Sequence, residues 1–156
     1  MIGIERVTAV SFGEFERLVR MYFDSMRIPP ELCDAAEELR RYIVPPCAAW
    51  LAFAPQACGT IALRPLPQRP GMCEVKRLFV APDFRGRGIA DALLDALEAF
   101  ARDAGYRSAY LDSRADMHAA HRFYRRRGFE DCERYSDNFD ATVFMRRSLM
   151  PAESSR

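Results

Sequence analysis

The chain has 156 residues, of which 49% are hydrophobic and 29% are charged, and its formal net charge is +1. This length and composition are typical of one globular domain with its own core, and they exclude a disordered or fibrous chain. The near-neutral charge provides no general attraction to nucleic acid or to an anionic membrane, so any anion must be bound by a local arrangement of residues. We therefore expect a single domain at residues 1–150 and neither of those partners.

The N-terminal sequence and the cysteine spacing indicate the compartment in which the protein is expected. The N-terminal residues lack the basic start and the long apolar stretch of a signal peptide, and no apolar run approaches the length of a membrane span. The five cysteines stand apart from one another, without a C-x-x-C pair. A disulfide framework or a zinc site is therefore not expected. We expect a cytoplasmic protein with reduced thiols and no metal.

The N-terminal part of the chain predicts one strand and two helices. Residues 2–10 alternate weakly between apolar and polar side chains, as a strand does. Ser11 and Glu14 have the spacing of a capping box, and the apolar residues after them repeat at helical period, so a helix should run to about Met26. A second helix with one shared apolar face is bounded by two proline pairs, at residues 29–30 and 45–46.

Three extended segments follow the second helix. The first two are separated by three residues, which is hairpin spacing, and a proline-rich connection leads to the third. An antiparallel meander is the interpretation of this pattern. The three strands are predicted at residues 47–54, 58–66 and 73–80.

The rest of the chain alternates helices with strands. Ile89 begins a helix whose apolar residues share one face, and Gly105 closes it. Asp116 and Gly128 should cap and end a shorter helix. The remaining strands are predicted at residues 107–111, 129–135 and 142–149. The order β-α-α-β-β-β-α-β-α-β-β indicates an α/β protein with a mixed sheet and helices packed on it, followed by a frayed tail at residues 151–156.

The loop Arg85-Gly86-Arg87-Gly88 joins an apolar strand to the helix that begins near Ile89. The first N–H groups of a helix have no intrahelical partner, and together with the helix dipole they attract anions. The two glycines allow positive φ and a close approach of an oxyanion, and the two arginines add charge-assisted donors. The loop predicts a phosphate-bearing cofactor, with a turn of solvated arginines as the alternative. P-loop, dinucleotide-binding and kinase loops are set aside, because Gly-Lys-Ser/Thr is absent and Asp91 stands where a third glycine belongs.

Two motifs in this part of the chain resemble those of the GNAT superfamily of acyl-CoA-dependent N-acyltransferases. Arg85-x-x-Gly88-x-Ala90 is similar to the family's Q/R-x-x-G-x-G/A signature, and it follows a strand that ends in Val80-Ala81-Pro82. The second signature, Y-x-x-x-G-F, is present from Tyr124 to Phe129. The resemblance is strong over residues 74–129 and implies a GNAT-type, mostly antiparallel central sheet flanked by helices.

The resemblance implies acetyl-CoA, or coenzyme A, as the cofactor. In the family the loop amides bind the pyrophosphate, and the preceding strand diverges from its parallel neighbour at a bulge, so that its free backbone groups pair with the pantetheine arm. A backbone N–H near Phe79 or Val80 would be the oxyanion donor. By this resemblance the cofactor-binding residues are Leu78, Phe79, Val80, Arg85, Gly86, Arg87, Gly88, Ile89 and Ala90.

Catalysis by such a protein needs a group that deprotonates the amine and a group that protonates the leaving thiolate. Tyr124 occupies the family position of the general acid, with packing against the sheet as the alternative. Glu74, at the start of the strand that contacts the cofactor, is the candidate base, commonly acting through water. A salt-bridged Glu74, with Lys76 or Arg77, is the competing interpretation.

The acceptor pocket implied by the resemblance is lined by Asp112 and Ser113, at the end of the neighbouring strand, and by Tyr135 and Asn138 in the loop between the last two strands. A cap or turn role is equally consistent with the Asp112-Ser113 pair. Met117 stands where many members have an asparagine that bonds the pantetheine. His118 and His121 have the spacing of half a metal site, but no third ligand is evident and a solvated helix face is favoured.

The sequence therefore predicts an N-acetyltransferase that moves an acetyl group from acetyl-CoA to a primary amine of a small molecule or peptide, by direct transfer in a ternary complex. A non-catalytic acyl-CoA sensor is the alternative, although the presence of both Glu74 and Tyr124 favours the enzyme. Because dimers are common among similar proteins, the resemblance also makes a homodimer possible. The sequence itself shows no symmetric interface.

Overall fold

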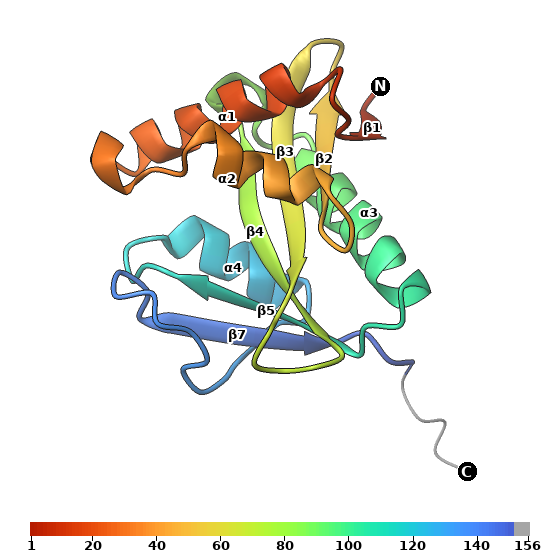
Figure 1. The fold of residues 1–156 in the computed structure, drawn as a ribbon, viewed down its shortest axis with the longest axis vertical. Coiled ribbons are helices and arrows are strands. Elements are labelled where there is room, and N and C mark those ends of the chain that lie inside the picture. Colours follow the sequence, from red (N-terminus) through yellow and green to blue (C-terminus); the bar gives the residue numbers. More distant parts are fainter. Residues whose placement is uncertain (152–156) are drawn as a thin grey trace.

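The computed structural model describes residues 1–151 and shows one seven-stranded sheet with helices on both faces (Figure 1). The tail was predicted at residues 151–156, and all of it after Pro151 lies outside the described residues. In spatial order the strands are β1 (Gly3–Arg6), β2 (Ala48–Phe53), β3 (Ala57–Pro65), β4 (Met72–Val80), β5 (Ser108–Ser113), β7 (Val143–Ser148) and β6 (Glu130–Asp131). The helices are α1 (Phe12–Ser25), α2 (Ala36–Arg40), α3 (Ile89–Asp103) and α4 (His118–Arg126).

The predicted fold class is confirmed, because all neighbouring strands of the sheet are antiparallel except β4 and β5. Helices α1 and α2 cover one face of the sheet and α3 and α4 the other (Figure 1). Each pair of helices shares one apolar cluster with the sheet face beneath it, as expected for a layered α/β fold.

Strands β4 and β5 pair only at their beginnings and then diverge. Their parallel register includes Met72 with Ser108, and it ends at Glu74 with Tyr110, while β4 continues to Val80. A bulge bends β4 where its register with β3 shifts, and Arg77 adopts a φ of 57° there. The structure therefore opens a gap between the two strands in the middle of the sheet.

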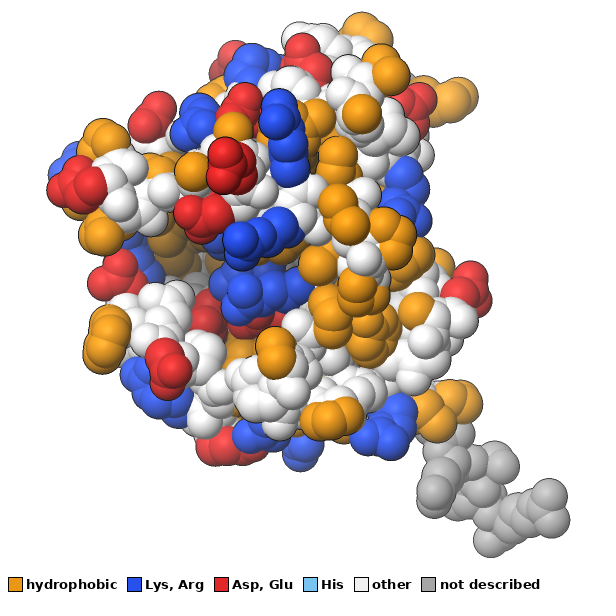
Figure 2. Space-filling view, viewed as in Figure 1, with side chains coloured by type: hydrophobic (Ala, Val, Ile, Leu, Met, Phe, Trp, Pro, Cys, Tyr) orange, Lys and Arg blue, Asp and Glu red, His pale blue; other side chains and the backbone are white. Residues whose placement is uncertain are grey.

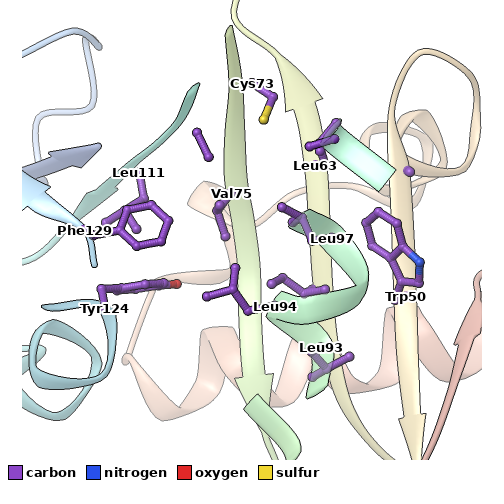
Figure 3. Packing of buried hydrophobic residues seen from close by; sticks show 14 of the residues in the cluster. Trp50, Leu63, Cys73, Val75, Leu93, Leu94, Leu97, Leu111, Tyr124 and Phe129 are labelled. Carbon is purple, nitrogen blue, oxygen red and sulfur yellow. The ribbon is translucent and has the colours of Figure 1, made fainter. Parts of the chain in front are cut away.

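Helix α3 packs closely on β3 and β4 through its apolar face. Leu93, Leu94 and Leu97 project from it onto the sheet (Figure 3). Gly59 of β3 makes this approach possible, because a Cβ at that position would lie 3.1 Å from the Cδ1 atom of Leu93. The tight packing fixes where α3 begins, at Ile89, and thus fixes the loop before it.

The second predicted helix is wrong in its length. A single 3-10 turn covers Pro30–Leu32, the backbone is then extended, and α2 begins only at Ala36. Leu32, expected on the buried face, is 67% exposed. The cause is a tertiary contact: Asp34 lies in the extended stretch and accepts hydrogen bonds from Arg77 of β4.

The predicted caps and the sixth strand also differ from the structure. Ser11 is the N-cap of α1, but its hydroxyl accepts a hydrogen bond from the Thr8 N–H, so the capping box is not made. Met117, and not Asp116, is the N-cap of α4, because the Asp116 carboxylate is bound by Arg114. Strand β6 is confined to two residues, since the chain leaves the sheet after them.

A buried carboxylate ties α3 to the opposite end of the sheet. Glu98 is 2% exposed and is bound by the guanidinium groups of Arg127 and Arg147, the former at 2.6 Å. Breaking a buried ion pair leaves unpaired charge behind. The two arginine side chains are 15% and 28% exposed, so solvent weakens the effect. We therefore expect a loss of unfolding free energy at the lower end of the range usual for a broken buried ion pair.

The Glu98→Ala variant should therefore lower the free energy of unfolding by about 3 kcal/mol, as measured by urea denaturation. Asp95→Ala is the matched control on the same helix: Asp95 also pairs with Arg127, but its side chain is 67% exposed, and its loss should cost less than about 1 kcal/mol. Equal effects of the two substitutions would contradict the assignment of Glu98 as a structural anchor.

Candidate active site

Two adjoining cavities lie where β4 and β5 diverge. One, here called the polar cavity, has a volume of about 260 Å³ and lies between the end of α1, β4 and β5. The other, here called the loop groove, has a volume of about 440 Å³ and lies between the end of β4, the start of α3, and α4. The hollow at the left of Figure 2, between the α1–α2 layer and the strands below it, is the mouth of the polar cavity. The residues that line both cavities are Tyr22, Leu78, Met117 and Ala120.

The loop before α3 has the backbone geometry of an anion site. Gly86 and Gly88 have φ values of 79° and 78°, in the left-handed region that favours glycine. Gly88 is the N-cap of α3, and a Cβ on either glycine would meet no atom within 4 Å, so the backbone faces open space. Ile89 and Ala90, the first residues of the helix, also line the groove. Their N–H groups, with the helix dipole, favour a negatively charged ligand.

The predicted arginines differ in where they point. Arg85 lines the loop groove, donates a hydrogen bond from Nε to the Val80 carbonyl at 3.0 Å and lies over the Phe79 ring. Arg87 is absent from the groove wall and stacks over Phe84 instead. Another cation replaces it there: Arg126 of α4, which pairs with Asp91.

Sequence reasoning missed Arg126, although it lies within the second motif, because its approach to the groove depends on how α4 packs. Ser25 of α1 and Phe123 of α4 line the same groove. They were also missed, because the packing of each helix against the sheet decides which of its residues reach the groove.

Leu78, Phe79 and Val80, the residues predicted to bind the cofactor, form the strand edge of the loop groove. Their register is with β3, and the parallel pairing with β5 has already ended at Glu74. The Val80 carbonyl accepts the Arg85 hydrogen bond, so it is already occupied. This edge of β4 is open to an extended ligand, in the manner of an added strand.

Tyr124 projects from α4 toward the polar cavity. It is 7% exposed and lines the polar cavity, and Figure 3 shows its hydroxyl directed across the gap toward β4. The hydroxyl makes no hydrogen bond to another residue within the described part of the chain. Burial raises the pKa of Tyr124 well above its ordinary value, and neighbouring Tyr22 adds to the rise. The phenol therefore keeps its proton in the neutral pH range, where it can serve as an acid but not as a base.

Glu74 is buried outside the walls of both cavities. Its carboxylate is inaccessible and accepts hydrogen bonds from Arg64 Nε at 2.6 Å and from the Tyr135 hydroxyl at 2.7 Å. The expected partners pair elsewhere, Lys76 with Asp112 and Arg77 with Asp34. Tyr135 was expected to reach over the acceptor pocket, but the structure places it against Glu74, where burial is the first cause of its raised pKa.

The other predicted acceptor residues line the polar cavity. Asp112 lies 3.6 Å from Lys76 Nζ and accepts a hydrogen bond from Ser136 at 2.7 Å. Ser113 and Asn138 line the same cavity. Its wall has matched charges, with three acidic and three basic side chains: Asp34, Asp112, Asp140, Lys76, Arg77 and Arg114.

The two histidines of α4 are unlike each other. His118 is exposed, as expected, but the expectation of a solvated face is wrong for His121, which is 5% exposed and lies 3.0 Å, Nε2 to Oγ, from Ser113. Within residues 1–151 no group of three or more His, Cys, Asp or Glu side chains is arranged to hold a metal ion. Met117, which stands where many family members have an asparagine, lines both cavities.

Comparisons with known proteins identify the family. The acetyltransferase (GNAT) family matches residues 15–129, and the chain belongs to it. An uncharacterized N-acetyltransferase of Schizosaccharomyces pombe is 30% identical over 144 residues, or 87% of each chain. An aminoglycoside N(6')-acetyltransferase type 1 of Stenotrophomonas maltophilia is 39% identical over 74 residues, 47% of this chain and 44% of that one. The resemblance drawn from the two motifs is confirmed, and acetyl transfer is the activity that these relatives support in general terms.

Solved structures share the fold. An acetyltransferase of the GNAT family from Staphylococcus aureus superposes with a TM-score of 0.84 at 21% identity, over 96% of this chain and all of that one. A PaiA N-acetyltransferase of Thermoplasma acidophilum, solved in complex with coenzyme A, has a TM-score of 0.78 at 18% identity, over 95% of this chain and 99% of that one. Among the described residues no helix combines the length and the apolar character that a membrane crossing requires.

Proposed function

We propose that this protein transfers an acetyl group from acetyl-CoA to a primary amine of a small molecule or peptide. The observation that carries the proposal is the adjacency of the two cavities: an anion-binding groove along an open strand edge adjoins a polar cavity, and Tyr124 lines the wall of that polar cavity. A thioester bound along the groove and an amine bound in the cavity would meet where the two adjoin, which favours direct transfer in a ternary complex.

The loop groove fits coenzyme A by its chemistry. The amides from Arg85 to Ala90 would bind the pyrophosphate, with Arg85 and Arg126 as charged donors and Arg87 at the outer side of the loop. Leu78, Phe79 and Val80 would pair with the pantetheine through their backbone. That a structural neighbour with the same fold holds coenzyme A supports this assignment.

The reaction replaces the carbon–sulfur bond by a carbon–nitrogen bond and moves a proton from the amine side to the thiolate. The amine nitrogen attacks the thioester carbonyl carbon, the carbon–sulfur bond breaks, and Tyr124 donates its proton to the departing thiolate. A backbone N–H near Phe79 or Val80 would stabilise the oxyanion. Glu74 remains a proposal for the base, and because both of its oxygens are already engaged it would act only through an intervening group.

The acceptor should be a small polar amine or a peptide end, since the polar cavity is small and balanced in charge. Asp112, Ser113 and Asn138 would contact it, whereas Tyr135 would act through Glu74. All five cysteines are free thiols, which supports a reducing compartment such as the cytoplasm.

Two measurements on the same protein test the proposal. Acetyl-CoA alone should raise the melting temperature, because it binds the folded state, and a panel of small amines should then stimulate thiol release. Stabilisation without thiol release for any amine would favour the acyl-CoA sensor. The absence of stabilisation would contradict the assignment of the loop groove.

A further inference from the structure

Ser113 and His121 form a polar pair at the wall of the polar cavity that the proposed reaction has not yet used. Ser113 ends β5 and lines the cavity, and its hydroxyl lies 3.0 Å from His121 Nε2. His121 is buried behind it on α4, one helical turn before Tyr124 and next to Ala120, which lines both cavities. A serine of the cavity wall thus has a buried imidazole within hydrogen-bond distance of its hydroxyl, which also donates a long hydrogen bond of 3.5 Å to the Arg114 carbonyl.

The surroundings of His121 keep its ring neutral near pH 7. Burial is the first cause that lowers its pKa, and the positive charges of Arg125 and His118 on the same helix lower it further. Hydrogen bonding to the Arg114 backbone, before α4, and the charge of Asp131, on β6, act in the opposite direction but do not reverse the shift. A neutral imidazole has one ring nitrogen free to accept a proton.

The carboxylates of Glu74 and Asp112 are less suited to take a proton from the acceptor. Glu74 lies outside the cavity wall and is engaged by Arg64 and Tyr135. Asp112 accepts a hydrogen bond from Ser136 and faces an ammonium group. Ser113 differs from both, because it lines the cavity and has a neutral base within hydrogen-bond distance.

We propose that Ser113 and His121 form a proton relay that deprotonates the acceptor amine, an inference that rests on the acetyltransferase function proposed above. As the amine nitrogen bonds to the thioester carbon, its surplus proton passes to Ser113 Oγ, and the hydroxyl proton of Ser113 passes to His121 Nε2. The carbon–sulfur bond breaks at the other side of the reacting carbon, where Tyr124 supplies the thiolate proton. The products are the N-acetyl amine, the free thiol, an imidazolium and a tyrosinate, and proton exchange with solvent restores both side chains.

The relay predicts a specific change in the pH dependence of the rate. The wild-type kcat should fall as the pH is lowered through the pKa of His121, because a protonated imidazole cannot accept a proton. That pKa lies below the ordinary value of 6.5. His121→Gln should lower kcat at least tenfold at pH 7.5 and remove that acidic limb, because glutamine can bond to Ser113 but cannot accept a proton. The thermal shift with acetyl-CoA should be unchanged, since His121 does not line the loop groove.

Two further variants make the experiment specific. His118→Gln is the matched control, because His118 is exposed one turn away on the same helix. It should preserve the rate at pH 7.5 and retain an acidic limb, shifted toward higher pH by the loss of the His118 charge. Ser113→Ala should reproduce the His121→Gln defect while leaving the imidazole in place, and it serves as the second variant if His121→Gln folds poorly. Ser113→Thr, which retains the hydroxyl, should recover part of the rate.

The outcomes separate this proposal from the one on which it rests. Wild-type turnover with an acidic limb that persists in His121→Gln and Ser113→Ala would overturn the relay alone. Loss of the limb in Glu74→Gln, with His121→Gln unaffected, would overturn it in favour of Glu74. If the wild-type protein released no thiol with any amine in the panel, both proposals would be rejected together.

Discussion

Gly88→Asp should abolish the stabilisation of the protein by acetyl-CoA. The substitution places a carboxylate at the N-cap of α3, where the loop amides would otherwise meet the pyrophosphate. Two unit charges about 4 Å apart repel by about 4 kcal/mol at the effective dielectric constant of a protein surface, which corresponds to roughly a thousandfold loss of affinity. Thermal shift and isothermal titration with acetyl-CoA measure the effect directly.

Two control variants separate charge from backbone strain. Gly88→Asn has nearly the same shape and adopts positive φ about as readily as Asp, so it should weaken binding much less. Gly105→Asp adds the same charge at a φ of 87° beyond the C-terminal end of α3, away from the groove, and should leave the affinity unchanged. If Gly88→Asn lost binding as completely as Gly88→Asp, electrostatic repulsion would not be the cause.

Local signals in the sequence predict the cofactor half of the site well. The strand, the glycine loop and the start of α3 are adjacent in the chain, and each of them is determined by neighbouring residues: the apolar run of β4, the two glycines with positive φ, and the helical period after Ile89. The side chain of Arg87 is the exception, because its stacking on Phe84 depends on the turn between them.

Contacts between distant parts of the chain account for what the sequence does not predict. Asp34 and Arg77 are 43 positions apart, and their ion pair interrupts the second helix at a place where helical period alone predicts continuity. Glu74 finds its partners on β3 and in the loop after β6, through pairings that only the sheet order establishes.

The catalytic half of the site depends on such long-range placement more than the cofactor half does. Ser113 and His121 are eight residues apart, and they meet because α4 folds back along the end of β5. Their types carry no spacing signal of a known motif. A buried histidine beside a pocket serine can be recognised only when the helix face is known, and the polar sequence of α4 predicts a solvated face instead.

Tyr124→Phe should lower kcat at least tenfold while leaving the affinity for acetyl-CoA nearly unchanged. The ring packs against Phe123 and Phe129, with centroid distances of 5.4 and 5.3 Å, and phenylalanine preserves those contacts. Only the proton donor is lost, so the deficit should fall on the breakdown of the carbon–sulfur bond and appear in kcat. Single-turnover thiol release, with the thermal shift as the binding check, measures both quantities.

The neighbouring phenol decides whether the assignment is correct. Tyr22 lines both cavities and lies close enough to influence Tyr124, so Tyr22→Phe removes a second hydroxyl from the wall of the polar cavity. Its effect on kcat should be smaller than that of Tyr124→Phe, and a reversed order would identify Tyr22 as the acid. Because the pKa of Tyr124 lies above 10, the acid stays protonated, and no falling limb below pH 10 should trace to its ionisation. A leaving thiolate that needs no protein acid would instead leave both variants at the wild-type rate, and the donor would then be solvent.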